Sequence, residues 1–454
     1  MKQFSKKIVL AATLICILPT AMLKAQDTLK VSLSKALEIA MSESPTIKVA
    51  DKEIQRVDYS KKEKFAALFP TISASGSYQR AVKKQRMFLP FSVVPGSPPD
   101  PAGIEIGVDN TLNAGLAASI PIISPTLWAS LEMTETDAKL ALESARSSKI
   151  SLVNQVTKAY YTILLTQDQY DVFKRSLQNT SENAMIIKNK FKQGTVSEYE
   201  WIRADVQVRN ASSNLVSAES AVNMSKLQLK MLMGLDMFTG LKVEGSLSDF
   251  EKNMYGDVLN IDTTSLKSNT DLYQFDLKSK LMDQTLKIQK ASWWPTLAAS
   301  FNYMYMSMAN DGTALKWFPT STAALQLNIP IYQGGSRVYK EKQLKIQMEE
   351  LKDQRDNLRR SLEMQAIGYL DNIKKAMEKI SSNKEGLRQA EKAVSISTKM
   401  YEVGSGTYLD LSNSELAFIS AGLSYNQSIF DYLSAKADLE KLLGNDASIV
   451  KTKK

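Results

Sequence analysis

The sequence contains no histidine, and its 454 residues include only one cysteine, Cys16. A Ser-His-Asp triad, a Cys-His pair, a histidine-based zinc site and a CxxC redox motif are therefore excluded. Cys16 lies in an N-terminal segment that we expect to be removed, so a disulfide within the mature chain is excluded as well. We accordingly expect no catalytic residue, no cofactor and no bound metal.

Glycine and proline are scarce, with 19 and 13 residues among 454. Both residues interrupt helices, so their scarcity in a long chain predicts long helices. At about 150 residues per domain, the length corresponds to roughly two to four domains. The apolar content of 44% and the charged content of 23% are typical of a folded protein.

Residues 1–25 have the parts of a secretory signal: lysines at the start, an apolar run over 8–18 and a small residue, Ala25, before the expected cleavage. The run has about 11 residues where a spanning helix needs about 20, which favours a signal over a membrane anchor. Cleavage removes four lysines and no acidic residue, and lowers the formal net charge from +9 to +5. The mature sequence has neither a basic block interleaved with aromatics nor a long apolar run. We therefore expect no nucleic-acid partner and no transmembrane helix.

The sequence repeats itself once, at an offset of about 210 residues, which predicts two structural repeats. Four short motifs recur in the same order, namely Phe69-Pro70-Thr71-Ile72 with Trp294-Pro295-Thr296-Leu297, Ser119-Ile120-Pro121-Ile122 with Asn328-Ile329-Pro330-Ile331, Phe191-Lys192-Gln193-Gly194 with Tyr401-Glu402-Val403-Gly404, and Leu232-Met233-Gly234 with Leu442-Leu443-Gly444. The first repeat is longer between its first two motifs. Prolines cluster at 90–101 in that interval and predict an exposed loop.

Apolar residues recur every seven positions in two long segments, 125–192 and 335–403, that contain no proline after Pro125. They are Ile163, Tyr170, Leu177, Ala184 and Phe191 in the first segment, and Ile373, Ile380, Leu387, Val394 and Tyr401 in the second. This spacing keeps one seam of a helix against a partner helix, as in a coiled coil or the core of a soluble bundle. A helix of about 68 residues would be about 100 Å long. Shorter helices are expected at about 33–66, 197–233, 268–292 and 408–443.

Four segments alternate between apolar and polar residues, which predicts strands at about 71–80, 111–120, 296–306 and 321–329. Their polar faces are small and uncharged, as suits the wet lumen of a transmembrane barrel, although soluble hairpins packed on a core would show the same period. Four strands cannot close a barrel, and open edges are not tolerated in lipid, so a membrane role requires several chains. Aromatic residues near the strand ends are candidates for the membrane interface: Trp293, Trp294, Trp317 and Phe318.

The order of these features resembles that of the TolC-type outer membrane efflux proteins. Each repeat reads as a helix, a strand, a loop, a strand ending in Ile-Pro-Ile, a long helix, a glycine turn and a further helix. The stretch Asn-Ile-Pro-Ile-Tyr-Gln-Gly-Gly at 328–335 is similar to the family's second strand-to-helix transition. The stretch at 400–410 is similar to its helical-hairpin turn. The resemblance covers the mature chain.

The resemblance implies a mixed α and transmembrane β fold, in which three copies form a twelve-stranded outer-membrane barrel and an α-helical tunnel in the periplasm. It divides the chain into a first repeat at 26–240, an equatorial segment at 241–267, a second repeat at 268–445 and a basic tail at 446–454. The implied function is a passive exit duct for efflux or type I secretion. The implied partners are two further copies, outer membrane lipids, a periplasmic adaptor and an inner-membrane transporter of the RND, ABC or MFS type.

The resemblance also assigns roles to the two glycine turns, which would lie at the periplasmic tip. Adaptor docking is carried over to Gly194, Thr195, Val196, Gly404, Ser405 and Thr407. The pore mouth or gate is carried over to Glu200, Tyr401 and Asp410. Helix termination by the glycines, and a favourable contact of each carboxylate with its own helix start, are the structural alternatives.

Two departures from the family's pattern affect the expected latch at the mouth. Gly406 stands where the family has an arginine, and Asn413 stands where it has a second aspartate. We therefore expect a closed state that is held differently or more loosely. Lys83, Lys84 and Arg86 follow the first strand, and are expected either in solvent or against lipopolysaccharide phosphates.

Two other classes of function stay open from the residues alone. A periplasmic coiled-coil adaptor or scaffold would explain the long helices but not the four alternating segments. A carboxylate-based hydrolase would need two carboxylates that meet in space, which the sequence does not indicate. Fractionation into an outer-membrane trimer or a soluble periplasmic protein would separate these readings.

Overall fold

The structure is a computed structural model that describes residues 29–88, 103–251, 254, 266–310 and 316–444. The predicted signal at 1–25, the proline-rich loop and the tail at 446–454 lie outside the described residues. The chain divides into two compact units. The first contains residues 1–48, 148–268 and 362–454, and the second contains residues 49–147 and 269–361.

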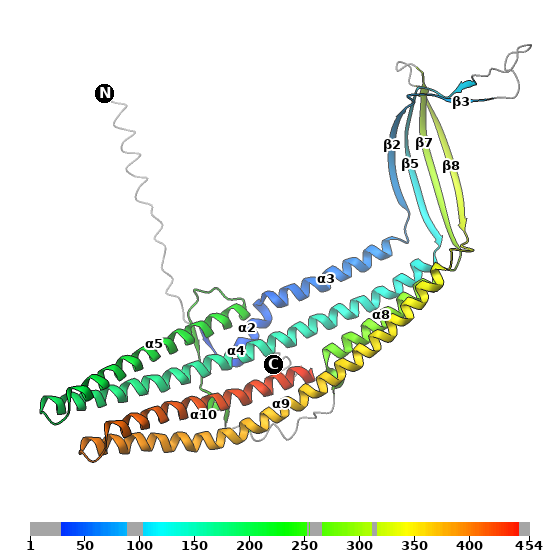
Figure 1. The fold of residues 1–454 in the computed structure, drawn as a ribbon. Coiled ribbons are helices and arrows are strands. Elements are labelled where there is room, and N and C mark those ends of the chain that lie inside the picture. Colours follow the sequence, from blue (N-terminus) through cyan, green and yellow to red (C-terminus); the bar gives the residue numbers. More distant parts are fainter. Residues whose placement is uncertain (1–28, 89–102, 252–253, 255–265, 311–315, 445–454) are drawn as a thin grey trace, which may run out of the picture. The chain divides into compact units, whose positions relative to one another are not determined.

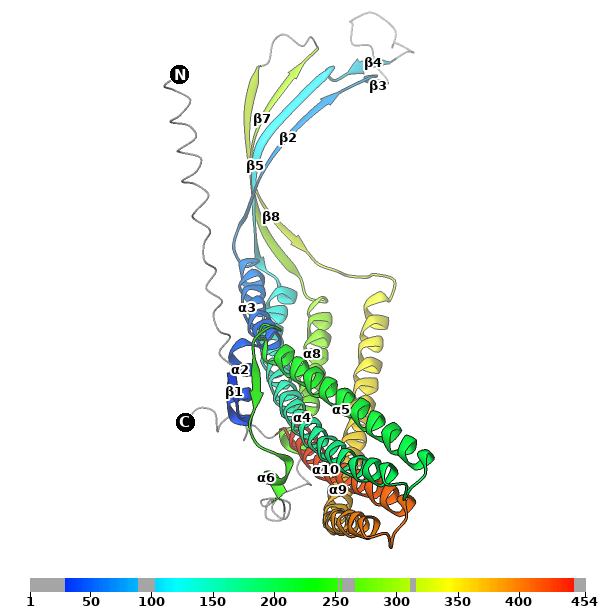
Figure 2. The same cartoon turned by 90° about the vertical axis from the view of Figure 1, so that its left-hand side faces the viewer.

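The second unit carries an antiparallel sheet of four strands in the order β2-β5-β7-β8 (Figures 1 and 2). The strands are β2 (Thr71–Arg80), β5 (Asn110–Ile123), β7 (Thr296–Ala309) and β8 (Trp317–Asn328). The first three contain their alternating segments and β8 contains all but the last residue of the fourth, so period two was a sufficient signal. Strand β8 begins earlier than predicted and includes Pro319, and it is an edge strand of this chain's sheet, where prolines in strands are found.

The regular four-stranded sheet is modified by a bulge between β5 and β7 and extended by a separate two-stranded ribbon. The β5–β7 register shifts between Pro121 and Ile123, where the proline cannot donate to the ladder. Beyond the main sheet, β3 (Gln85–Met87) pairs with β4 (Ile104–Ile106), where the sequence predicted only loop. Lys84 and Arg86 form ion pairs with Asp109 and Glu105 at 3.1 and 3.0 Å. Acidic neighbours thus already hold two of the three cations considered for lipid phosphates.

Two helices are far longer than those of ordinary domains, as predicted. Helix α4 (Pro125–Lys192) has 68 residues and helix α9 (Ser336–Glu402) has 67. Ile163, Ile373 and Ile380 of the heptad stripe are at most 1% exposed, so the stripe is a packed seam. None of the helices among the described residues has an apolar stretch long enough to cross a bilayer.

In the first unit, each long helix turns back into a second helix. Helix α4 continues into α5 (Glu198–Met233) and α9 continues into α10 (Tyr408–Leu443). Ser197 and Thr407 cap the returning helices, because each side-chain oxygen accepts the N–H group three residues later. Gly234 and Gly444 end them in the left-handed conformation. The two hairpins therefore have the same local design.

The predicted helix at 33–66 was wrong in one respect, because it is two helices. Helix α2 (Leu33–Glu43) ends before Ser44, and α3 (Pro45–Ala66) begins with a proline. Ser44 has ψ of 131°, outside the helical region. A residue before proline is driven out of the helical region by the proline ring, which explains the break.

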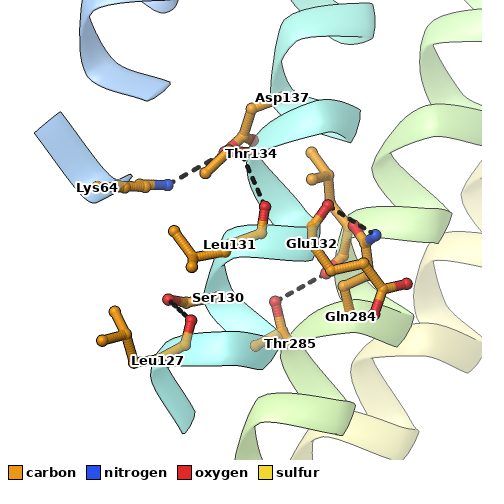
Figure 3. A network of polar contacts seen from close by, with 10 residues as sticks. Lys64, Leu127, Ser130, Leu131, Glu132, Thr134, Asp137, Gln284 and Thr285 are labelled. Atoms are coloured by element: carbon orange, nitrogen blue, oxygen red, sulfur yellow. Dashed lines mark hydrogen bonds and ion pairs between the residues drawn. The ribbon is translucent and has the colours of Figure 1, made fainter. Parts of the chain in front are cut away.

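Polar contacts tie the helices of the second unit together (Figure 3). Lys64 of α3 lies 3.3 Å from the Asp137 carboxylate of α4. Gln284 of α8 (Thr270–Ala291) donates to the Glu132 carbonyl of α4 at 3.4 Å. The Lys64–Asp137 pair is partly exposed and contributes little to stability, whereas the Gln284 side chain is buried.

A short segment between the repeats is fastened to the helices of the first unit. Strand β1 (Leu29–Val31) pairs in parallel with β6 (Leu241–Val243), followed by α6 (Leu247–Glu251), and η2 (Leu266–Ser268) precedes α8. Glu251 bonds to Lys384 at 2.9 Å and to Tyr425 at 2.8 Å. The Leu247 N–H donates to Asp168 of α4 at 3.0 Å. Strand pairing and hydrogen bonds to two carboxylates thus hold the part of the predicted equatorial segment that the structure describes.

Asp168→Asn should make the protein more stable at neutral pH. Burial, opposed by the Leu247 N–H and aided by Asp171 and Asp249, raises the pKa of Asp168 to about 6 from 3.8. The folded chain therefore binds this proton between pH 3.8 and about 6 while the unfolded chain does not, and wild-type stability falls as pH rises through that window. The amide avoids this loss. Allowing for solvent screening of a partly buried group, we expect a gain of about 1 to 2 kcal/mol at pH 7.

Thermal unfolding of both proteins at pH 4 and pH 7 measures this effect. The stability difference should be largest at pH 7 and small at pH 4. If the difference in stability between the two proteins were the same at pH 4 and pH 7, the role given to Asp168 would be contradicted.

Candidate functional site

The two glycine turns at the tips of the hairpins have the same backbone geometry. Gly194 and Gly404 have φ of 74° and 81°, a region that L-residues with a side chain rarely adopt. The N–H groups of Thr195 and Ser405 bond to helix carbonyls five residues earlier at 3.0 and 2.9 Å. These are Schellman turns, which satisfy the last carbonyls of α4 and α9. A Cβ at either glycine would meet nothing within 4 Å, so backbone conformation alone requires glycine.

An apolar cluster joins the two hairpins just behind the turns. Its buried members are Ala184, Ile187, Ala204, Tyr401 and Leu411, which come from all four helices. Val196, which the resemblance assigned to docking, is half-buried and packs against this cluster. Thr195, Ser405 and Thr407 are exposed. Val196 and Thr407, the N-cap of α10, therefore have clear structural roles as well.

Tyr401 and Glu200, two of the three predicted mouth residues, contact each other. The Tyr401 hydroxyl, at the end of α9, donates to Glu200 Oε2 in the first turn of α5 at 3.2 Å. Tyr401 is 5% exposed, and burial followed by the Glu200 charge raises its pKa to about 12. The phenol therefore stays a proton donor throughout the neutral range. This bond ties the second hairpin to the first at the tip.

Lys190 adds a contact to the same tyrosine that sequence reasoning missed. Its Nζ donates to the Tyr401 carbonyl and lies 4.6 Å from the centre of the Tyr401 ring. Lys190 lies in α4, so Tyr401 is held by both helices of the first hairpin. In the sequence, Lys190 is notable only because it precedes the repeated motif that starts at Phe191. A lysine in the last turn of a helix is also expected there, because it stabilises the helix dipole.

Asp410, the third predicted mouth residue, makes a different contact. Its carboxylate accepts the Thr407 N–H at 3.2 Å and the Thr407 hydroxyl at 2.6 Å, which completes a capping box. These hydrogen bonds lower the pKa of Asp410. The structural alternative given for this carboxylate is therefore observed, while Glu200, at the matching position of the first repeat, reaches Tyr401 instead.

Asp410→Ala should loosen the first turn of α10. Hydrogen exchange of the Thr407 amide, which loses its acceptor, should become about fivefold faster, as expected when one half of a capping box is lost. Because the pKa of Asp410 is lowered, the wild-type advantage should be complete above pH 3.8 and lost as the pH falls further. Asp410→Asn retains an acceptor and serves as the control. Unchanged exchange in Asp410→Ala would contradict the capping role.

Gly406, where the family pattern has an arginine, is closely packed. A Cβ there would lie 3.0 Å from the Met400 Cβ and 3.4 Å from the Tyr401 backbone nitrogen. A side chain at this position would need the end of α9 to shift. The position of the missing arginine is thus one where the turn leaves little room for a side chain.

Arg203 supplies a cation near the predicted mouth residues that the sequence did not single out. Its guanidinium lies 5.6 Å from the Tyr199 ring and 5.1 Å from the Tyr408 ring, which belong to different hairpins. Cation–π contacts of this kind orient an arginine without neutralising it. The region of the predicted mouth residues therefore contains positive as well as negative charge.

The predicted interface aromatics lie at opposite ends of the β7–β8 pair. Trp293 and Trp294 precede β7, whereas Trp317 and Phe318 begin β8 and pair with Ser307 and Met306 at the far end. All four are at least 43% exposed. Among the described residues, no group of three or more acidic or cysteine side chains is arranged to hold a metal ion.

Known proteins similar to this chain include outer membrane proteins and a secretion protein. The chain is 19% identical over 336 residues to the outer membrane protein TolC of Vibrio cholerae, which covers 73% of this chain and 76% of the relative. It is 22% identical over 318 residues to the alkaline protease secretion protein AprF of Pseudomonas aeruginosa, with 68% and 64% covered. The crystal structure of VceC from Vibrio cholerae superposes with a TM-score of 0.71 at 14% identity, over 91% of this chain and 96% of VceC.

The family model described as outer membrane efflux protein matches residues 36–235 and 263–445, one block for each repeat. The two blocks contain both helical hairpins and all four strands of the sheet. The chain belongs to the outer membrane efflux protein family.

Proposed function

We propose that this chain is the outer-membrane exit duct of a tripartite efflux or type I secretion system, and that it passively conducts cargo out of the periplasm. The observation that carries the proposal is the family match over both repeats, joined to a sheet with two open edges and two long helical hairpins. The family is one of channels rather than enzymes. We propose accordingly that the chain catalyses no bond chemistry.

The sheet supports a homotrimer. Strands β2 and β8 are its edges, and unpaired backbone groups at an edge are too costly in lipid. Three copies would pair β2 of one chain with β8 of the next and close twelve strands. Twelve is an even number within the range of bacterial barrels.

The aromatic residues support a membrane position for the sheet. About 11 rungs separate the start of β7 from the Trp317 rung, or about 37 Å at 3.4 Å per residue. A strand tilted by about 40° would then rise about 28 Å, close to the apolar thickness of a bilayer. Trp293 and Trp294 would lie at one interface, and Trp317 and Phe318 at the other.

The hairpin tips support a gated mouth at the periplasmic end. The Tyr401–Glu200 bond joins the second hairpin to the first, so opening requires its loss. The exposed turn residues around Gly194 and Gly404 would receive a periplasmic adaptor, which in turn would connect to an inner-membrane transporter. Efflux and secretion share this arrangement, and the adaptor and transporter would determine the cargo.

Conductance across a planar bilayer tests the duct. The purified, detergent-extracted protein should migrate as a trimer and give small single-channel steps from a mostly closed mouth. A soluble monomer in the periplasmic fraction that gives no steps would overturn the proposal and favour a coiled-coil scaffold.

A further inference from the structure

Glu415 is a carboxylate buried between the two hairpins, and the mouth described above does not use it. It lies in α10 and is 6% exposed. Asn183 of α4 donates to its Oε1 at 2.5 Å, and the Thr180 hydroxyl donates to its Oε2 at 3.3 Å. Both donors are themselves buried, at 4% and 5% exposure. A charged group of the second hairpin thus depends on neutral donors of the first.

No cation compensates this carboxylate among the residues that the structure describes. Arg175, the nearest arginine along α4, pairs with Glu391 at 2.7 Å and lies over the Phe418 ring. Lys399 and Glu402 of α9 line, with Asn183, a cavity of about 320 Å³, and Tyr408 is the titratable neighbour on α10 itself. From α5, Glu200 and Arg203 act on that tyrosine with opposite sign. The surrounding charges therefore largely offset one another. The free-energy cost of removing the Glu415 carboxylate from water is not offset by any of them.

We propose that Glu415 favours opening of the mouth. Its buried charge destabilises the contact between the two hairpins in the closed state, and opening exposes that charge to water. This inference rests on the proposed gated duct. The geometry is consistent with the direction of the titration, since burial raises the pKa of Glu415 and the bonds from Asn183 and Thr180 oppose that shift only in part. Neutralising the carboxylate should therefore close the mouth, and removing a donor should open it.

Two substitutions with opposite expected effects test the proposal in single-channel recordings of the full-length protein. Glu415→Gln keeps an acceptor for Asn183 and a donor for Thr180 but removes the charge, so the open fraction should fall at least about fivefold. Asn183→Ala leaves the charge with fewer donors, so the open fraction should rise about tenfold. Thr180→Val is a nearly isosteric second variant that should also raise it. A purely structural role would move all three in the same direction.

The pH profile separates charge from packing. A closed state with the higher carboxyl pKa binds the proton more tightly, so the wild-type open fraction should fall as pH is lowered from 7 toward 4.5, the ordinary value. This slope should be weaker in Glu415→Gln. Glu182→Gln, one residue from Asn183 but exposed, is the matched control and should behave like wild type.

Three outcomes would overturn the proposal. They are an open fraction in Glu415→Gln that equals or exceeds that of wild type, a fall in the open fraction with Asn183→Ala or Thr180→Val, and an unchanged pH slope in Glu415→Gln. Helicity and trimer migration would verify that each variant is folded. Absence of channels in wild type would instead contradict the proposed duct itself.

Discussion

Replacing Tyr401 by phenylalanine should raise the open fraction of the channel about tenfold. The substitution removes one hydroxyl, the donor to Glu200 at 3.2 Å, and leaves the buried ring in place. Hydrogen bonds to charged groups contribute about 1.5 to 3 kcal/mol, and the partial exposure of Glu200 reduces this to about 1.4 kcal/mol. That free energy corresponds to a factor of about ten in the closed-to-open equilibrium. Single-channel recording in a planar bilayer measures it directly.

Tyr408→Phe is the matched control for this experiment. Tyr408 lies beside Tyr401, with ring centres 6.4 Å apart, but its hydroxyl has no hydrogen-bond partner among the described residues. Its open fraction should therefore change little. Glu200→Gln should give an intermediate effect, because an amide oxygen still accepts the phenol. If Tyr401→Phe and Tyr408→Phe behaved alike, the Tyr401–Glu200 bond would have no part in the gate.

Long-range periodicity made the fold readable from the sequence. The seven-residue stripe predicted α4 and α9, and strict alternation predicted segments of all four sheet strands. Both signals accumulate over many residues, so a single exception does not erase them. The ribbon of β3 and β4 was missed because three residues are too few to show a period. The break at Ser44 was readable but overlooked, since Pro45 disfavours a helical Ser44 and favours the first position of a new helix.

The contacts of the predicted mouth residues were not readable from the sequence. Glu200 and Asp410 occupy matching places in the two repeats, six residues after a glycine, and the sequence treats them alike. The structure separates them, because Asp410 turns back to Thr407 while Glu200 reaches across to Tyr401. Such a choice depends on which side chain the other hairpin presents, which is a property of packing. Lys190 and Glu415 were missed for the same reason.

Gly115→Ala should strongly destabilise the sheet. Gly115 lies in the central strand β5, and a Cβ there would be 2.6 Å from the Tyr303 carbonyl oxygen and 3.0 Å from the Met304 Cα of β7. Both are backbone atoms, which cannot rotate away as a side chain would. Overpacking of this kind costs about 1 to 3 kcal/mol, and the forced separation of the β5–β7 ladder adds to it in a medium without water. We expect a loss of at least about 3 kcal/mol, seen as a lower melting temperature of the folded protein in detergent.

Gly76→Ala, in the neighbouring strand β2, is the control that isolates close approach from the general effect of glycine in a strand. A Cβ at Gly76 would lie 3.9 Å from the Asn113 carbonyl oxygen, an ordinary contact. Alanine should therefore be neutral or stabilise the protein by up to about 1 kcal/mol, because glycine loses more conformational freedom on folding. Each variant adds one methyl group, and the two positions lie in adjacent strands of one sheet. Equal melting temperatures would mean that β5 and β7 are not packed as closely as their register requires.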